Sequence, residues 1–127
     1  MSRLSEELRW RTKRYASAAI KLYLELPRDR KDVQILGVQL LRSGTSVAGH
    51  AREASRARSN AEFCSKLDVL LQEADESALW LELLREDCRI EGDLIKRLWC
   101  ETDELLAIFT SMVSKIRRSS SGSSDRS

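Results

Sequence analysis

The side chains best suited to chemistry gather in one stretch of this 127-residue chain, Leu40–Ala54, which reads LLRSGTSVAGHAREA. Between its basic residues lie five small ones: Gly44, Thr45, Ser46, Ala48 and Gly49. A phosphate-binding loop of the form G-x-x-x-x-G-K-[ST] has lysine directly after its second glycine, whereas His50 follows Gly49 here. We therefore expect a helix whose small side chains let a neighbouring helix come close.

The single histidine offers little for catalysis. His50 precedes Glu53 by one helical turn, but di-iron bundles use Glu-x-x-His on two helices with two further glutamates. Here the order is reversed and no second histidine exists. Nothing in the sequence completes a nucleophilic triad around His50, and the three cysteines lack the spacing of structural zinc ligands. We expect no enzyme, no cofactor and no metal, with His50 as a partly buried helix residue hydrogen-bonded to a neighbour.

Phosphate binding is the chemistry that the arginines favour. At 100° per residue, three of them lie on one helical face with Thr45 and Gly49, opposite the apolar residues. Guanidinium groups bind phosphate bidentately, and small residues between them allow a close approach. With a fourth arginine nearby, the predicted nucleic-acid-binding residues are Arg42, Arg52, Arg56 and Arg58. No aromatic residue interleaves this stripe, so binding should be largely indifferent to base sequence. The alternatives are a solvated face or pairing with an acidic helix of a neighbouring subunit.

The formal net charge of +2 conceals a strong asymmetry. Residues 1–58 carry 13 Lys and Arg against 6 Asp and Glu, which gives +7. Residues 59–93 carry 3 against 10, which gives −7, and residues 94–127 carry 6 against 4. Opposed charge blocks suit helices that pair within one chain or across subunits, and they leave a basic half that attracts phosphate.

Apolar residues recur every three or four positions in four segments, which predicts four helices. The first runs from about Ser5 to Leu26, and the second starts near Asp29 or Lys31 and continues through the small residues. A capping box, Ser59–Glu62, opens the third, and a turn over 87–93 precedes the fourth. Short connections force antiparallel neighbours. We predict an all-α, antiparallel up-down-up-down four-helix bundle over residues 1–118, followed by a disordered Ser-rich tail, 119–127.

The fourth helix has more apolar residues than the single stripe that a monomeric bundle needs. Trp80 and Trp10 also project off the apolar seams of the third and first helices. These surplus residues predict a homo-oligomer, with an interface formed by Trp80, Ile95, Trp99, Leu106 and Val113. No apolar run spans a bilayer, the N-terminus lacks the apolar region of a secretory signal, and the odd number of cysteines suits a reduced compartment. We expect a cytoplasmic protein that does not engage membranes.

The segment Gln39–Leu84 resembles a known family, the four-helix-bundle proteins encoded by intervening sequences of bacterial 23S rRNA genes, often labelled S23 ribosomal proteins. The match is carried by RSGTSV at 42–47, REA at 52–54, EADE at 73–76 and WLELL at 80–84. Where the family commonly has asparagine before Ile-Arg-Glu-Ala, this chain has Gly49, His50 and Ala51. The resemblance implies a ring-like homo-oligomer, with a homopentamer as the expectation. A related branch, the accessory proteins of diversity-generating retroelements, binds nucleic acid and reverse transcriptase.

Two hypotheses follow for function. The first is a non-enzymatic, oligomeric bundle that binds RNA or DNA through its basic helix face, favoured by the +7 segment and the resemblance. The alternative is a structural or protein–protein interaction module without nucleic-acid binding, favoured by the near-neutral charge of the whole chain.

Overall fold

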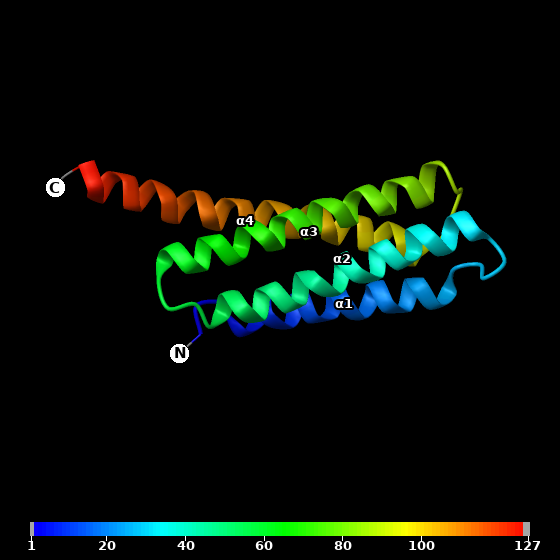
Figure 1. Ribbon diagram of the computed structural model, residues 1–127, viewed down its shortest axis with the longest axis horizontal. Coiled ribbons are helices and arrows are strands. Elements are labelled where there is room, and N and C mark those ends of the chain that lie inside the picture. The colour runs from blue at the N-terminus through cyan, green and yellow to red at the C-terminus, as the bar shows by residue number, and fades with distance from the viewer. Residues whose placement is uncertain (1, 126–127) are drawn as a thin grey trace.

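Four helices pack around one apolar core in the computed structural model, which describes the backbone of residues 2–125 and the side chains of residues 2–119 (Figure 1). They are α1 (Glu6–Glu25), α2 (Lys31–Ser55), α3 (Asn60–Glu86) and α4 (Asp93–Asp125). Within the described part of the chain there is no strand. Each helix packs against the next along the chain, and α4 also packs against α1, so the four close into a bundle. The predicted all-α, four-helix fold is confirmed.

Local capping explains where the helices begin. The Ser5 hydroxyl accepts a hydrogen bond from the Leu8 N–H at 3.1 Å, and the Ser59 hydroxyl accepts one from the Glu62 N–H at 3.0 Å. The predicted capping box is therefore present in its first half. Its second half is displaced by one residue, because the Glu62 carboxylate accepts from the Arg58 N–H and not from the cap residue itself.

The segment predicted to be a disordered tail is continuous with the last helix. The backbone of α4 is helical to Asp125, through most of residues 119–127, while Arg126 and Ser127 lie outside the described residues, as does Met1. A helix satisfies its own backbone hydrogen bonds, so it can extend beyond its last apolar residue. The domain boundary after residue 118 remains a prediction.

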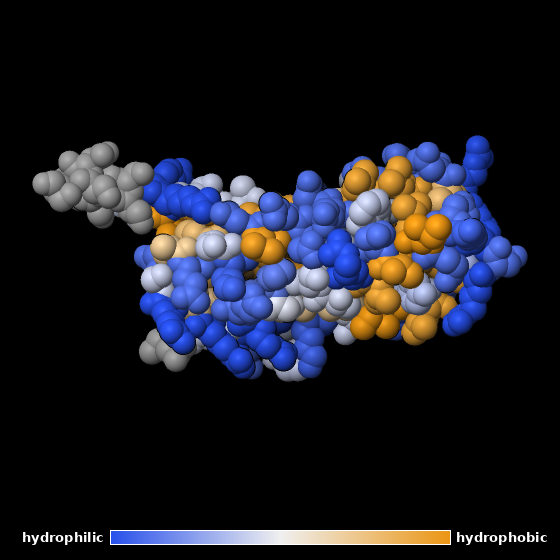
Figure 2. All heavy atoms as spheres, viewed as in Figure 1, coloured by the Kyte–Doolittle hydropathy of each residue, from blue (hydrophilic) through white to orange (hydrophobic). Residues whose placement is uncertain are grey.

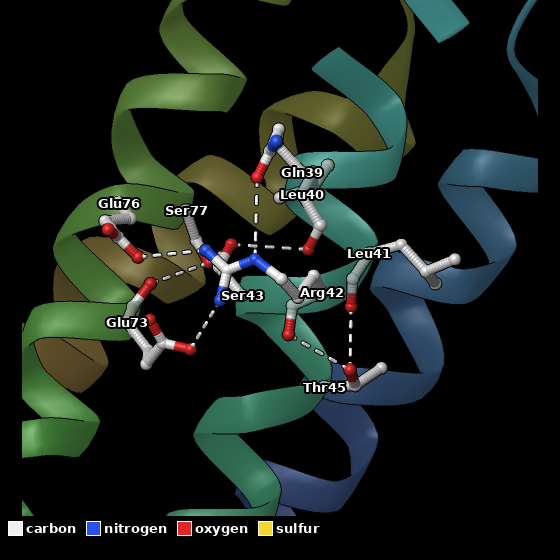
Figure 3. Close-up of polar contacts among 9 residues, drawn as sticks. All are labelled: Gln39, Leu40, Leu41, Arg42, Ser43, Thr45, Glu73, Glu76 and Ser77. Atoms are coloured by element: carbon white, nitrogen blue, oxygen red, sulfur yellow. Dashed lines mark hydrogen bonds and ion pairs between the residues drawn. The ribbon is translucent and has the colours of Figure 1, made fainter. Parts of the chain in front are cut away.

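The core holds two buried hydroxyl pairs among its apolar side chains. The Tyr15 hydroxyl pairs with Thr102 across α1 and α4, and Ser43 pairs with Ser77 across α2 and α3 at 2.7 Å (Figure 3). Thr102 and Ser77 each also donate to a carbonyl of their own helix, at 2.7 and 2.9 Å. Because Thr102 already donates its hydroxyl hydrogen to the Leu98 carbonyl, the Tyr15 hydroxyl is the donor in its pair, and burial raises the pKa of that hydroxyl. Both pairs are satisfied, so they join neighbouring helices without leaving one of these hydroxyls unpaired.

A half-buried ion pair joins α1 to α4 and gives the fold a pH dependence. Arg11 donates two hydrogen bonds to Glu101, at 2.7 and 2.8 Å, and these lower the pKa of the Glu101 carboxyl. A carboxyl with a lowered pKa in the folded state stabilises the fold above its ordinary pKa, near 4.5. That stabilisation is lost as the pH falls through the folded-state pKa.

We therefore expect Glu101→Gln to lower the free energy of unfolding by about 1 kcal/mol at pH 7. The difference in the free energy of unfolding between wild type and variant should shrink as the pH falls below 4.5. Urea titrations at several pH values measure this difference. The control is Asp68→Asn, which breaks the more exposed Asp68–Arg117 pair and should have a smaller effect. If this difference in the free energy of unfolding is the same at pH 3 as at pH 7, the pH dependence does not come from the Arg11–Glu101 pair.

Candidate nucleic-acid interface

The four arginines predicted to bind nucleic acid occupy three different settings. Arg42 donates to Glu73 and Glu76 of α3, both at 3.2 Å, so its charge is matched within its own chain (Figure 3). Pairing of the stripe with the acidic third helix was predicted as an alternative across subunits, and at Arg42 it occurs within the chain. Arg58 lies in the connection between α2 and α3 and does not line the groove described next.

The remaining two arginines, Arg52 and Arg56, line a groove of about 540 Å³ between the last turns of α2 and the first turns of α1. The α1 wall adds two further cations, Arg9 and Lys13, which the sequence prediction did not include. The groove holds one carboxylate, Glu6. Among residues 2–119, none of the four cations forms an ion pair. We call this feature the basic groove; strongly hydrophilic residues cover that end of the molecule in Figure 2.

Small residues keep the groove open on the α2 side. Gly49 and Ala48 line it, and a Cβ added at Gly49 would meet no atom within 4 Å. Thr12 of α1 and Ser55 of α2 also line the groove; both are buried, and their hydroxyls donate to the carbonyls of Arg9 and Arg52 in their own helices. The small-residue stretch therefore has two different roles. Its Gly44 packs against α1, while its Gly49 faces open space.

An aromatic side chain also lines the basic groove. Trp10 of α1 is 50% exposed, and the Lys13 ammonium lies 4.9 Å from the centre of its ring. The expectation that no aromatic residue accompanies the arginines holds along α2 but is wrong for the folded surface, because α1 supplies the indole. Arg9 and Lys13 flank Trp10 in the sequence and are one helical turn apart, a signal that was present but not used.

His50 behaves as a structural helix residue, as predicted. It is partly buried, and its Nδ1 lies 3.3 Å from Glu53 Oε2, which also receives Lys66 Nζ at 3.3 Å. These two hydrogen bonds, from His50 first and then Lys66, lower the pKa of the Glu53 carboxyl. Within the described residues, no three His, Cys, Asp or Glu side chains converge as metal ligands would.

The residues predicted to form the oligomer interface belong mostly to the core of the single chain. Ile95 is 1% exposed and Val113 is 5% exposed, while Trp80, Trp99 and Leu106 are half-buried and pack against the same core. This corrects the sequence argument, which allowed each helix one apolar stripe. Because α4 packs against both α3 and α1, its wide apolar arc is used within the chain.

The exposed apolar residues lie elsewhere, on the last turns of α1, the first turns of α2 and the last turns of α3. We call this set the apolar end: Ile20, Leu24, Ile35, Val38 and Leu79. In Figure 2 apolar residues gather over the side where α1 joins α2, opposite the hydrophilic side. The basic groove and the apolar end thus lie at opposite ends of the bundle.

The fold and surface define a small four-helix protein with a basic groove, and comparison with known proteins agrees with that class. The family model described as 23S rRNA-intervening sequence protein matches residues 8–111, and the chain belongs to this family. A crystal structure of a protein of unknown function of the S23 ribosomal protein family, from Bacteroides thetaiotaomicron VPI-5482, shares 31% sequence identity. It aligns with a TM-score of 0.75 over 83% of this chain and 96% of that one. No curated protein matches the chain.

The family match confirms the resemblance inferred from the segment 39–84 and extends it over nearly all of the four helices. Trp10 and all four cations of the basic groove lie inside the matched region. In the part of the chain that the structure describes, no helix combines the length and apolar character needed to cross a membrane.

Proposed function

We propose that this protein is a non-enzymatic, cytoplasmic, homo-oligomeric bundle that binds the phosphate backbone of RNA or DNA in the basic groove. The observation that carries the proposal is the set of four cations, Arg9, Lys13, Arg52 and Arg56, which face one groove without ion-pair partners among the described residues. Unpaired cations that face each other repel, and a polyanion relieves that repulsion while releasing its own counterions.

The arrangement of the cations suits a phosphate chain better than a single small anion. Arg9 and Lys13 are four residues apart on one wall, which spans about 6 Å along α1, and Arg52 and Arg56 are four residues apart on the other, where Arg56 caps the C-terminus of α2. A backbone that follows the groove therefore meets cations from both walls in succession. Arg42 contributes less, because Glu73 and Glu76 already neutralise it.

The antiparallel arrangement and the oligomer are part of the same proposal. Gly37 of α2 lies against Leu26 of α1, and Gly44 lies against Ala19, so residue numbers rise in opposite directions along the two helices. The oligomer is supported by the apolar end, where five large apolar side chains are 44% or more exposed in the single chain. The resemblance to the family gives a homopentamer as the expected state. The free cysteines suit a reducing cytoplasm.

Removing the groove arginines should weaken binding to all nucleic acids alike. For Arg52→Gln with Arg56→Gln, we expect a similar loss of affinity on every RNA tested, because phosphate contacts carry no sequence information. Each lost contact should flatten the slope of log affinity against log salt concentration by roughly 0.7–0.9. Electrophoretic mobility shift against structured rRNA fragments, repeated across a salt series, measures both quantities.

The matched control is Arg42→Gln on the same helix. Because Arg42 is paired with α3, its loss should change the salt slope less than the loss of either groove arginine. If the double variant keeps its helical circular dichroism and its oligomeric state while affinity and slope stay at wild-type values, phosphate binding in the groove is excluded.

A structural or protein–protein interaction module is the second candidate, and the apolar end is the observation that favours it. A wild-type protein that forms its oligomer but shifts no RNA or DNA at low salt would support this candidate over the first.

A further inference from the structure

The basic groove contains a side chain that phosphate binding does not explain. Trp10 is half exposed even with the Lys13 ammonium over its ring, and it lies among the four cations. An exposed indole is an apolar surface in water, and flat apolar rings are the surfaces on which nucleic-acid bases stack. Phosphates alone would use the cations and leave this ring uncovered.

The space beside Trp10 is large enough for a nucleotide. The groove measures about 540 Å³, within the range of pockets that hold small organic ligands. Gly49 and Ala48 form part of its lining, so no long side chain from that stretch fills the space. In a duplex the bases are already paired and stacked inside the helix, and they cannot reach a ring in such a groove. An unpaired base can.

We propose that the basic groove binds single-stranded nucleic acid, with an unpaired base stacked on Trp10 and the flanking phosphates held by Arg52, Arg56 and the α1 cations. The inference rests on the proposed function and names its substrate class. Base preference is weak, because every base has a face that can stack. The hydroxyls of Thr12 and Ser55 already donate to their own helices and have no hydrogen left to donate to a base edge.

The test compares two RNA probes of equal length, a uridine 12-mer and a blunt-ended duplex, on wild type and Trp10→Leu. Stacking of one base corresponds to roughly a 5- to 150-fold change in affinity, so Trp10→Leu should weaken binding of the uridine 12-mer by that factor. Its affinity for the duplex should stay unchanged, and so should the salt slope, because no charge is removed. Trp10→Phe, which keeps a flat ring, should recover part of the loss.

Two further measurements separate stacking from a general loss of structure. The uridine 12-mer should quench the tryptophan fluorescence of the wild type, and the quenching should disappear in Trp10→Leu, which retains the half-buried Trp80 and Trp99. Gly49→Leu should also weaken single-strand binding, since a Cβ at this groove-lining position meets no atom within 4 Å and a longer side chain would take up space in the groove.

The outcomes distinguish this inference from the proposed function. If Arg52→Gln with Arg56→Gln weakens both probes while Trp10→Leu changes neither, phosphate binding stands and base stacking is overturned. Equal losses on both probes in Trp10→Leu also overturn stacking, because the ring would then act on the groove as a whole. If wild type binds neither probe at low salt, the proposed function fails and this inference fails with it.

Discussion

Gly44→Leu is expected to lower the free energy of unfolding by about 1–3 kcal/mol, because this position has no room for a side chain. A Cβ at Gly44 would stand 2.9 Å from the Ala19 Cβ and 3.9 Å from a ring carbon of Tyr15. The Ala19 Cβ is fixed to the backbone of α1, so only a displacement of one helix relieves the contact. Urea denaturation followed by circular dichroism measures the loss.

Two other glycines of α2 provide matched controls. At Gly49 a Cβ meets nothing within 4 Å, so Gly49→Ala should stabilise the helix by up to about 1 kcal/mol through its higher helix propensity. At Gly37 the nearest atom, 2.7 Å away, is the end of the flexible Leu26 side chain, which can rotate, so Gly37→Ala should cost less than Gly44→Ala. Ala19→Gly should rescue Gly44→Ala. Unchanged stability of Gly44→Leu would exclude close packing as the reason for this glycine.

The sequence was sufficient for the helices because their signals are local. Apolar spacing, the cap at Ser59 and the stop at Pro27 each act within a few residues, and together they placed all four helices. The apolar residues on either side of the glycines keep the helical spacing, which predicted that α2 continues as a helix through them. Two details differed: the backbone of α4 is helical to Asp125, through most of the predicted tail, and the Glu62 carboxylate has another partner, which depends on the backbone of the loop before the helix.

The candidate site could be predicted only in part, because it depends on how two helices are rotated against each other. Arg52 and Arg56 could be assigned to one face of α2, but whether Arg9, Trp10 and Lys13 face the same groove is decided by the packing of α1 against α2. The pairing of Arg42 with α3 likewise depends on the fold. The spacing of residues in the sequence predicts which side chains share one face of a helix. It does not predict which face of another helix lies opposite them.

The predicted oligomer interface stays a prediction, although the core of the single chain already buries two of its residues, Ile95 and Val113. The sequence argument assumed that α4 packs against one neighbouring helix, which needs only a narrow apolar stripe. In the structure α4 packs against two helices, so a wide apolar arc is buried within the chain. The exposed fraction of each side chain can be known only from the assembled fold. It shows that the large apolar side chains left exposed in the single chain include those of the apolar end, on α1, α2 and α3.

Ile35→Glu with Val38→Glu is therefore expected to convert the proposed oligomer into folded monomers. The two side chains are 54% and 49% exposed in the single chain, so the fold does not need them, and a partner subunit is what would bury them. Two carboxylates placed in an apolar interface would lose their hydration without gaining partners, a penalty of several kcal/mol for each ion. Sedimentation velocity at micromolar concentration should show one discrete oligomer for wild type and a monomer for the variant.

The matched control is Leu106→Ala on α4, from the interface first predicted. Because Leu106 packs against the core of its own chain, its loss should lower the unfolding temperature and leave the oligomer intact at temperatures where the chain is folded. The opposite pattern, in which Leu106→Ala dissociates the oligomer and the two glutamates do not, would show that the interface is on α4.

The basic groove lies at the other end of α1 and α2, so monomers of the glutamate variant should keep their affinity for a short RNA that occupies one groove. Binding of a longer RNA, which engages several grooves of one oligomer, should weaken as the subunits separate.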